Sequence, residues 1–376
     1  MSDYGDLNFD DEWRDEPLKK YLRKKKKRDN ITDTRFDDLR RALIKAPENS
    51  DYQSWDEFLD WQNGQTIDDA WAFLDQMREA GLSENTCREY MAIISTFLSS
   101  LLEKGIVVDS NPAKYVHDEA NFDPEEKNWI DRTPNEVGEY LSSIGDPLFQ
   151  SAGTVFVKTG IRQGENYNID LPYLHIDHPS YYALLEKHDV AIHEKIADRP
   201  DSLFIPSEPT IGEEYRGEKR LLGNKRVRPT ILPLDEETKH SLLNWLAVRP
   251  ITEYPHPLWT GKKSYQGRER IGKNAFKRRI TGDLAEKHGF YSADSNKKFT
   301  LHWFRHFFTT NMKPGFGHHD QHMDPIMIKY LRGDKNTSSR SDNQSGADIM
   351  EVYTHDWGDQ IRQPYLQNIY QFGIYD

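Results

Sequence analysis

The sequence predicts a mainly α protein that contains one small antiparallel β-sheet. Apolar residues recur with the 3.6-residue period of a helix from about residue 32 to 116, and again in several stretches after residue 133. Between those stretches, residues 203–234 hold short apolar runs and a Gly-Asn turn, a pattern typical of strands. The 376 residues are enough for two or three domains.

The N-terminal part is strongly charged. Residues 1–16 are acidic and lack the apolar core of a signal peptide. Residues 17–28 hold eight Lys and Arg and no acid. We therefore expect residues 1–31 to be a charged arm. Two interpretations stay open, a flexible tail or an arm that lies along DNA and adds salt-dependent affinity.

Residues 32–117 are expected to form a compact helical domain. Its helices are predicted at residues 36–44, 55–61, 67–77 and 83–105. Ser83 is the expected N-cap of the long fourth helix, and Asn111-Pro112 is expected to close the unit. The tryptophans at 55, 61 and 71 are more typical of a core than of a platform for stacking bases.

A polar, acidic stretch at 118–132 predicts a linker to a second domain, residues 133–376. That domain begins with the helix-start signal Thr133-Pro134-Asn135-Glu136. Further helices are predicted at 149–161, 236–248, 273–288, 300–308, 325–332, 347–353 and 364–370. A hairpin is predicted to turn at Gly223-Asn224 and to close through residues 230–234.

Composition limits the possible functions. The net charge of -12 argues against a protein that coats nucleic acid through its overall charge. Residues 216–306 nevertheless hold 20 Lys and Arg against 9 Asp and Glu, which predicts a local basic face. Cys87 is the only cysteine, so a disulfide framework and a Cys-based metal site are excluded. No apolar run is long enough to cross a membrane, and we expect a cytoplasmic protein.

Four separated pieces of the second domain carry side chains suited to phosphate chemistry. His302 and Arg305 share one face of a predicted helix, and Arg162 follows another helix with Glu165 behind it. Lys225 lies at the predicted hairpin turn, and Tyr353 follows a polar loop. Arginine offers a planar fork of donors that matches phosphate oxygens. This set could break a phosphodiester by covalent catalysis.

The expected roles follow from that chemistry. Two guanidiniums would hold the charge of the transition state without a metal. Tyr353 would be the nucleophile, and His302 would help it lose its proton. A lysine on a mobile hairpin would protonate the leaving oxygen, an effect of about 10²–10⁴-fold. We expect no metal and no nucleotide cofactor.

These pieces, in this order, resemble the tyrosine recombinase (phage integrase) family over most of the chain. The run TGIRQGE at 159–165 resembles its first arginine motif, and residues 223–234 resemble its lysine hairpin. LHWFRH at 301–306 resembles its His-x-x-Arg box, and VYTH at 352–355 its nucleophile motif. The resemblance implies a helical, SAM-like core-binding domain followed by a mixed α+β catalytic domain. The acidity is compatible with a virus or plasmid of a salt-adapted archaeon.

The resemblance also implies a site-specific DNA recombinase, an integrase that cuts and rejoins strands through a 3′-phosphotyrosine link at Tyr353. Its partner would be a double-stranded recombination site, bound by a homodimer, with a homotetramer in the synaptic complex and no membrane. Glu165 would brace Arg162. The expected phosphate contacts are Arg226, Arg228, Lys273 and Arg278.

The chain departs from the family where a His or Trp usually follows a Gly, because Gly333 is followed by Asp334. An ionised Asp repels phosphate, so Asp334 would orient His302 or another donor, or His355 would substitute for the missing donor. Lys219 is an alternative to Lys225 as the catalytic lysine. A histidine cluster at 318–322 could bind metal but is more typical of an exposed loop.

Two tyrosines compete with Tyr353 for the role of nucleophile. Tyr365 and Tyr370 lie in an apolar helical pattern, so we expect them in the core or in subunit contacts. Three rival functions remain. They are a type IB topoisomerase-like enzyme, a DNA-binding protein that has lost catalysis, and a helical protein that binds RNA or another partner.

Overall fold

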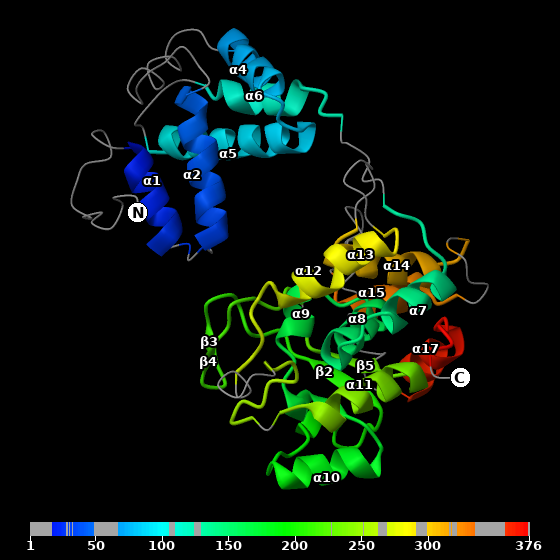
Figure 1. The fold of residues 1–376 in the computed structure, drawn as a ribbon. Coiled ribbons are helices and arrows are strands. Elements are labelled where there is room, and N and C mark those ends of the chain that lie inside the picture. The colour runs from blue at the N-terminus through cyan, green and yellow to red at the C-terminus, as the bar shows by residue number, and fades with distance from the viewer. Residues whose placement is uncertain are drawn as a thin grey trace. The chain divides into compact units, whose positions relative to one another are not determined.

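The computed structural model describes residues 17–374 with gaps. The residues left out are 1–16, 28, 30, 32, 49–66, 105–109, 124–128, 227, 251, 262–268, 291–298, 316, 318–321, 335–357 and 375–376. The chain divides into two units, Met1–Glu126 and Lys127–Asp376, each with its own hydrophobic core (Figure 1). The division falls inside the stretch predicted to be a linker.

The first unit is helical. Its helices are α1 (Pro17–Lys27), α2 (Asp33–Glu48), α4 (Ile67–Glu79), α5 (Glu84–Leu102) and α6 (Pro112–Glu119). The long helix α5 packs against α2, α4 and α6, and its residues Phe97, Leu98 and Leu101 are fully buried. Ser83 caps α5 as predicted, because its side chain accepts a hydrogen bond from the backbone N of Thr86.

Two predictions for this unit are wrong. The flexible-tail interpretation of the basic run is wrong, because residues 17–27 form α1, whose Tyr21 and Leu22 are buried and whose Tyr21 ring lies 5.0 Å from that of Phe97. The other interpretation, an arm that lies along DNA, stays a prediction. Asn111 does not close the unit. It caps α6 by accepting from the backbone N of Lys114. The helix predicted at 55–61 lies outside the described residues.

The second unit is mainly helical and contains a small antiparallel sheet, as predicted for the fold class, together with a separate two-stranded one. Its helices are α7 (Pro134–Ser142), α8 (Pro147–Thr159), α9 (Gln163–Tyr167), α10 (Pro179–Lys187), α11 (Glu236–Val248), α12 (Ala275–Ile280), α13 (Asp283–Lys287), α14 (Leu301–Met312), α15 (Pro325–Arg332) and α17 (Gln363–Asn368). Short turns of helix are η1 (Leu171–Tyr173), η2 (Glu194–Ile196) and the π-helical η3 (Gly358–Arg362). No described helix is both long enough and apolar enough to cross a bilayer.

The strands predicted at 203–205 and 230–234 are present, but the chain between them does not form the predicted turn. β1 (Leu174–His175), β2 (Ser202–Ile205) and β5 (Thr230–Pro233) form an antiparallel sheet in the order β1-β2-β5. The hairpin is a separate one, β3 (Glu214–Tyr215) with β4 (Glu218–Lys219). Gly223-Asn224 is not its turn. The Asn224 side chain instead donates to the carbonyls of Pro206 and Glu208, which fixes the connection between β2 and β5.

Helix α8 is the centre of the second unit. It packs against α7, α9, α11, α12 and α14, and ten of its residues are buried. It ends at Gly160, as the sequence suggested, where the backbone is left-handed with φ 63°. A Cβ at Gly160 would lie 2.5 Å from the Phe308 ring, so α14 packs directly against this helix end.

The C-terminal segment docks beside α8 and α11. Tyr365 and Tyr370 are buried, as predicted for core residues, and donate to the carbonyls of Lys158 and Val157. The Glu237 carboxylate accepts from the backbone nitrogens of residues 372–374. The predicted helix at 347–353, which includes Tyr353, lies outside the described residues.

Candidate active site

Arg162 is held at the turn between α8 and α9. Because Gly160 stops α8, Arg162 becomes the N-cap residue of α9. Its backbone N donates to Glu165 Oε2 at 2.9 Å, and its Nη1 donates to Glu165 Oε1 at 2.9 Å. Glu165 is fully buried. This carboxylate therefore fixes both the backbone and the guanidinium of Arg162, as the sequence suggested for a brace.

Arg305 and His302 project from α14. The apolar stripe of this helix buries Phe304 and Phe308 against the core. Arg305 is only 2% exposed, and its Nη1 donates to the carbonyls of Gly160 at 2.6 Å and Arg332 at 2.9 Å. His302 is exposed, with its ring 5.9 Å from that of Trp129.

Asp334 lies between the two predicted arginines. Helix α15 ends at Gly333, which has φ 67°, and the chain then presents Asp334 to the site. Its Oδ1 accepts from Arg162 Nη2 at 2.8 Å and from Arg305 Nη2. Its Oδ2 pairs with Arg332 Nη2 at 3.1 Å. Of the roles predicted for Asp334, this geometry supports orienting the arginine donors.

The charges of the site shift the pKa values of its groups. Burial, together with the nearby Arg332 and Arg162, lowers the pKa of Arg305 to about 9, although Asp334 acts in the opposite direction. Burial likewise lowers the pKa of Arg332. Burial acts to raise the pKa of Glu165, but Arg226 and Arg162 outweigh it and hold that pKa below its usual value. The site therefore has an excess of positive charge in a partly buried place.

Arg226 does not suit the DNA contact predicted for it. It is 6% exposed, and its Nη2 donates to Glu165 Oε2 at 3.3 Å and to the carbonyl of Leu331 at 2.9 Å. A Cβ at Gly333 would lie 2.6 Å from Arg226 Cγ, so a glycine makes room for this side chain. Arg226 thus ties Glu165 to the end of α15 inside the protein.

Lys225 precedes Arg226 in the chain. Its side chain is exposed, while the flanking Asn224 and Arg226 are buried. A Cβ at Gly164 would lie 2.1 Å from the Gly223 carbonyl oxygen, so the backbone before Lys225 runs against α9. The Lys225 segment is therefore fixed beside the turn that carries Arg162.

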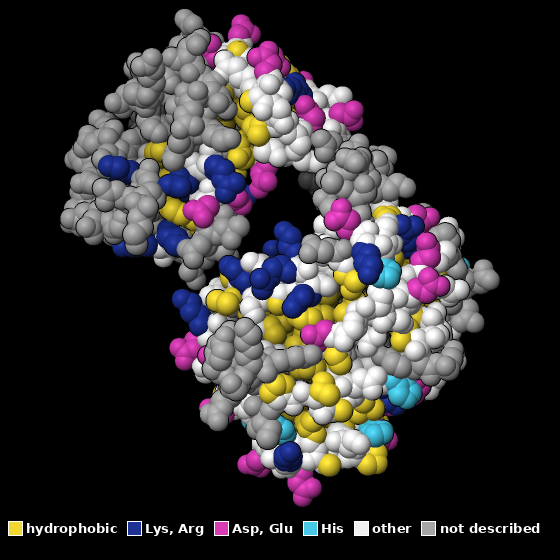
Figure 2. Space-filling view, in the orientation of Figure 1, with side chains coloured by type: hydrophobic (Ala, Val, Ile, Leu, Met, Phe, Trp, Pro, Cys, Tyr) yellow, Lys and Arg dark blue, Asp and Glu magenta, His cyan; other side chains and the backbone are white. Residues whose placement is uncertain are grey.

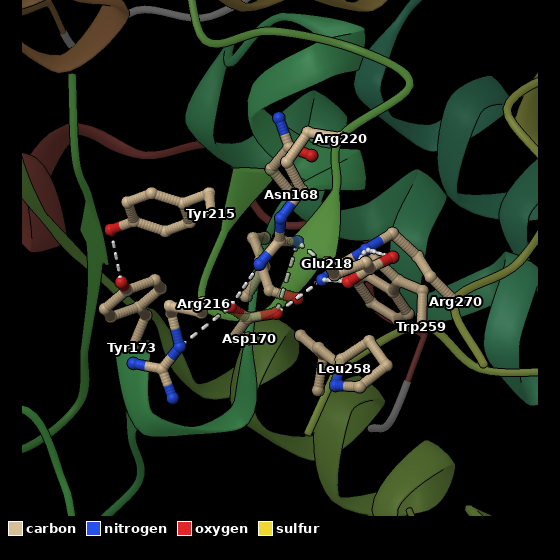
Figure 3. A network of polar contacts seen from close by, with 12 residues as sticks. Asn168, Asp170, Tyr173, Tyr215, Arg216, Glu218, Arg220, Leu258, Trp259 and Arg270 are labelled. Atoms are coloured by element: carbon tan, nitrogen blue, oxygen red, sulfur yellow. Dashed lines mark hydrogen bonds and ion pairs between the residues drawn. The ribbon is translucent and has the colours of Figure 1, made fainter. Parts of the chain in front are cut away.

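Lys219 lies elsewhere, on β4 of the hairpin. Asp170 anchors this hairpin by pairing with Arg216 at 3.3 Å and Arg220 at 2.8 Å (Figure 3). Arg270 also pairs with Asp170, at 2.5 Å, and with Glu218 of β4 at 3.0 Å. The predicted mobile lysine hairpin is thus a hairpin tied to the body by buried ion pairs, and Lys225 is not on it.

Lys219 also lines a different cavity from the His302–Arg305 pair. His302, Arg305, His306 and Arg332 line a cavity of about 280 Å³. Lys219 and Arg278 line another of about 960 Å³, together with Tyr254 and residues of α12. Lys219 therefore does not share the cavity of the His-x-x-Arg pair.

A basic face lies over α12. Lys273 and Arg278 are exposed, as are Lys277 and Arg279, and Figure 2 shows Lys and Arg side chains gathered in this region. Gln163 Nε2 donates to the carbonyl of Lys273 at 3.0 Å, which links this face to α9. Arg228 is half-buried, so Lys273 and Arg278 are the more accessible of the predicted contacts.

Tyr353 lies outside the described residues, and so do His355 and most of the histidine cluster at 318–322. Burial raises the pKa of both Tyr365 and Tyr370 well above the usual value, which disfavours either as a nucleophile. Among the described residues, no group of His, Cys, Asp and Glu could hold a metal ion. The sequence did not single out Arg332, because its contacts with Arg162 and Arg305 come from segments that are distant in the chain.

No family model and no curated protein matches the chain. Solved structures do match it. The Tn1549 transposon integrase in complex with transposon right end DNA has a TM-score of 0.57 and 17% identity, covering 88% of this chain and 97% of that one. A lambda integrase dimer bound to a COC′ core site has a TM-score of 0.53 and 14% identity, covering 87% and 98%.

The chain has the fold of these integrases. A lambda integrase tetramer bound to a Holliday junction also matches, with a TM-score of 0.54 and 13% identity over 87% of this chain and 74% of that one. At such identities the similarity concerns the fold, so the activity must be argued from the site. The predicted fold class, mainly α with a small antiparallel β-sheet, is confirmed.

Proposed function

We propose that this integrase-fold protein is a site-specific DNA recombinase of the tyrosine recombinase family. It cleaves and rejoins DNA strands through a covalent 3′-phosphotyrosine intermediate at Tyr353. One observation carries the proposal. Arg162 and Arg305, from two separate elements, both donate to a single carboxylate oxygen of Asp334. A pair of guanidiniums that binds one anionic oxygen in this way is suited to a phosphodiester.

The proposed roles follow from the chemistry of these side chains. Arg162 and Arg305 hold the non-bridging oxygens of the phosphate as negative charge develops there. Tyr353 attacks phosphorus, and exposed His302 takes the proton from its hydroxyl. Lys225 gives a proton to the departing 5′ oxygen, while Glu165 keeps Arg162 in place. The phosphotyrosine bond conserves the energy of the broken strand for rejoining.

Duplex DNA is the proposed partner. The exposed Lys273 and Arg278 of the basic face are placed to bind the phosphate backbone without reading sequence. The similar integrase structures are DNA complexes, and they include a dimer and a tetramer. We propose the same states for this chain, a homodimer on one site and a homotetramer in the synaptic complex.

One observation favours a second candidate function. Asp334 places a carboxylate where an anionic substrate would bind, which is compatible with a DNA-binding protein that has lost catalysis. A covalent adduct separates the two functions.

The test uses a suicide duplex, nicked so that a cut strand cannot be rejoined, that carries DNA from beside the gene. Wild type and Tyr353→Phe are compared on a denaturing gel, after a binding assay establishes that both bind the duplex. We expect a shifted protein–DNA band for wild type alone. A band that persists in Tyr353→Phe assigns the nucleophile to another tyrosine. Binding by both proteins without an adduct refutes the recombinase and supports the binding protein.

A further inference from the structure

Arg332 meets the site through its backbone and its side chain. Its carbonyl accepts from Arg305 Nη1 at 2.9 Å and from Arg162 Nη1 at 3.4 Å. Its own Nη2 pairs with Asp334 Oδ2 at 3.1 Å. Its side chain lines the same cavity as His302 and Arg305. The last residue of α15 therefore touches both predicted arginines and faces the space beside them.

Asp334 receives three guanidiniums. Its Oδ1 binds Arg162 and Arg305, and its Oδ2 binds Arg332. A carboxylate presents two anionic oxygens, as a phosphodiester presents two non-bridging oxygens, so its contacts stand in for those of a phosphate. One carboxylate offsets only one of the three positive charges. The site therefore retains an attraction for an anion such as phosphate.

Arg332 is more exposed to solvent than Arg226, the arginine that has a structural role in the site. The Arg226 side chain is fully buried and tied to Glu165. The Arg332 side chain is 23% exposed, as is that of Asp334. Both members of the Arg332–Asp334 pair can therefore reach an incoming ligand, whereas Arg226 cannot.

We propose that Arg332 is a third phosphate-contacting residue, and that Asp334 occupies the phosphate position until DNA displaces it. This inference rests on the proposed function and adds one catalytic residue to it. An ionised Asp has no donor to offer a phosphate. Arg332, two residues earlier, supplies that donor from the same helix end. Asp334 in turn keeps three like charges together in the DNA-free protein.

The first test measures the binding of inorganic phosphate by titration calorimetry. Asp334→Asn keeps the shape of the side chain but removes the competing charge, so it should bind phosphate about tenfold more tightly than wild type. Adding Arg332→Ala to Asp334→Asn should abolish that gain. Arg199→Ala is the matched control, because its side chain is 30% exposed and pairs only weakly with Asp198 at 3.9 Å.

The second test uses the suicide duplex. Arg332→Ala should form the covalent adduct about 10²–10³-fold more slowly, the usual effect of losing one donor to a transition-state oxygen. Duplex binding should change little, because the basic face at α12 is intact. Arg332→Lys keeps the charge but not the forked donors, and should recover part of the rate. It also replaces Arg332→Ala if thermal unfolding shows that variant to be misfolded.

The outcomes show whether Arg332 binds phosphate or only forms an ion pair with Asp334. Asp334→Asn that binds phosphate no better than wild type refutes the stand-in role. Arg332→Ala and Arg332→Lys that behave like Arg199→Ala in both tests refute the ligand role. If wild type forms no adduct, the proposed function is wrong, but the phosphate titration still decides whether Arg332 binds the anion.

Discussion

Replacing Lys158 should destabilise the second unit strongly. Its side chain is fully buried in α8, and its Nζ donates to Asp235 Oδ2 at 2.7 Å, Glu237 Oε2 at 2.5 Å and the Tyr370 carbonyl at 2.6 Å. Lys158→Met fills much of the same volume but leaves two buried carboxylates without a cation. Those carboxylates would repel each other in a place that is largely closed to water.

The size of the effect follows from the burial of all three groups. Removing one member of a buried ion pair typically costs about 3–5 kcal/mol, because the remaining charge is uncompensated. For a unit of this size, residues 127–376, each kcal/mol lowers the melting temperature by about 2–4 °C. We therefore expect Lys158→Met to melt about 6–20 °C below wild type.

Thermal unfolding and limited proteolysis measure this together. Lys239→Met is the matched control on neighbouring α11, because Lys239 pairs with Asp201 at 3.0 Å and Glu236 at 2.9 Å but is partly exposed. It should cost less than Lys158→Met, because Asp201 keeps Arg362 as a second cation at 3.7 Å. Proteolysis should cut the segment near residues 358–374 sooner in Lys158→Met, because Glu237 also holds the backbone of that segment.

A shift as small as that of Lys239→Met would refute the reasoning. It would mean that water or protonation relieves the two carboxylates at little cost. Adding Asp235→Asn and Glu237→Gln to Lys158→Met gives the second check, because an uncharged cluster should regain part of the lost stability.

Three further predictions concern the site. Glu165→Gln should unfold at lower temperature than wild type at pH 7, and the difference in melting temperature should shrink below about pH 4.5. The folded state lowers the pKa of Glu165, so the stabilisation that its carboxylate provides is lost when it is protonated. A difference that stays constant from pH 7 to pH 3.5 would contradict this. Lys225→Ala should slow adduct formation about 10²–10⁴-fold, and a duplex with sulfur in place of the leaving 5′ oxygen should restore the rate, because a thiolate leaves without a proton. If Lys219→Ala instead shows this loss of rate and this rescue by sulfur, the proton comes from Lys219 on the β3–β4 hairpin. Lys273→Ala and Arg278→Ala should each reduce the slope of log affinity against log salt by about 1, and an unchanged slope would remove that residue from the DNA interface.

Local signals in the sequence predict the helices of the second unit well. Thr133, Pro134 and Glu136 form the predicted start of α7, with the full capping box. Helices α11 and α15 have the predicted bounds because each is framed by its own cap and stop signals. Pairing of strands depends on contacts that a local pattern does not contain, so the predicted turn at Gly223-Asn224 lies seven residues after the observed turn at Arg216-Gly217.

The site shows the same limit. The order of the pieces predicts that Arg162, Glu165 and Arg305 meet, and the structure brings them together. Burial separates residues that look alike in sequence. Arg226 is enclosed and its neighbour Lys225 is exposed, yet both read as basic residues of one loop. The partner of Asp334 could not be predicted, because three guanidiniums from distant segments share it.

The ends of two helices explain how a buried Arg305 can be kept ready for an anion. Helices α8 and α15 both end at a left-handed glycine, Gly160 and Gly333. The carbonyls that these helix ends present, Gly160 O and Arg332 O, both accept from Arg305 Nη1. Carbonyls at the C-terminal end of a helix carry the negative end of its dipole, so they favour a cation there. They offset part of the cost of burying Arg305 and fix one edge of its guanidinium, which leaves Nη2 to bind Asp334.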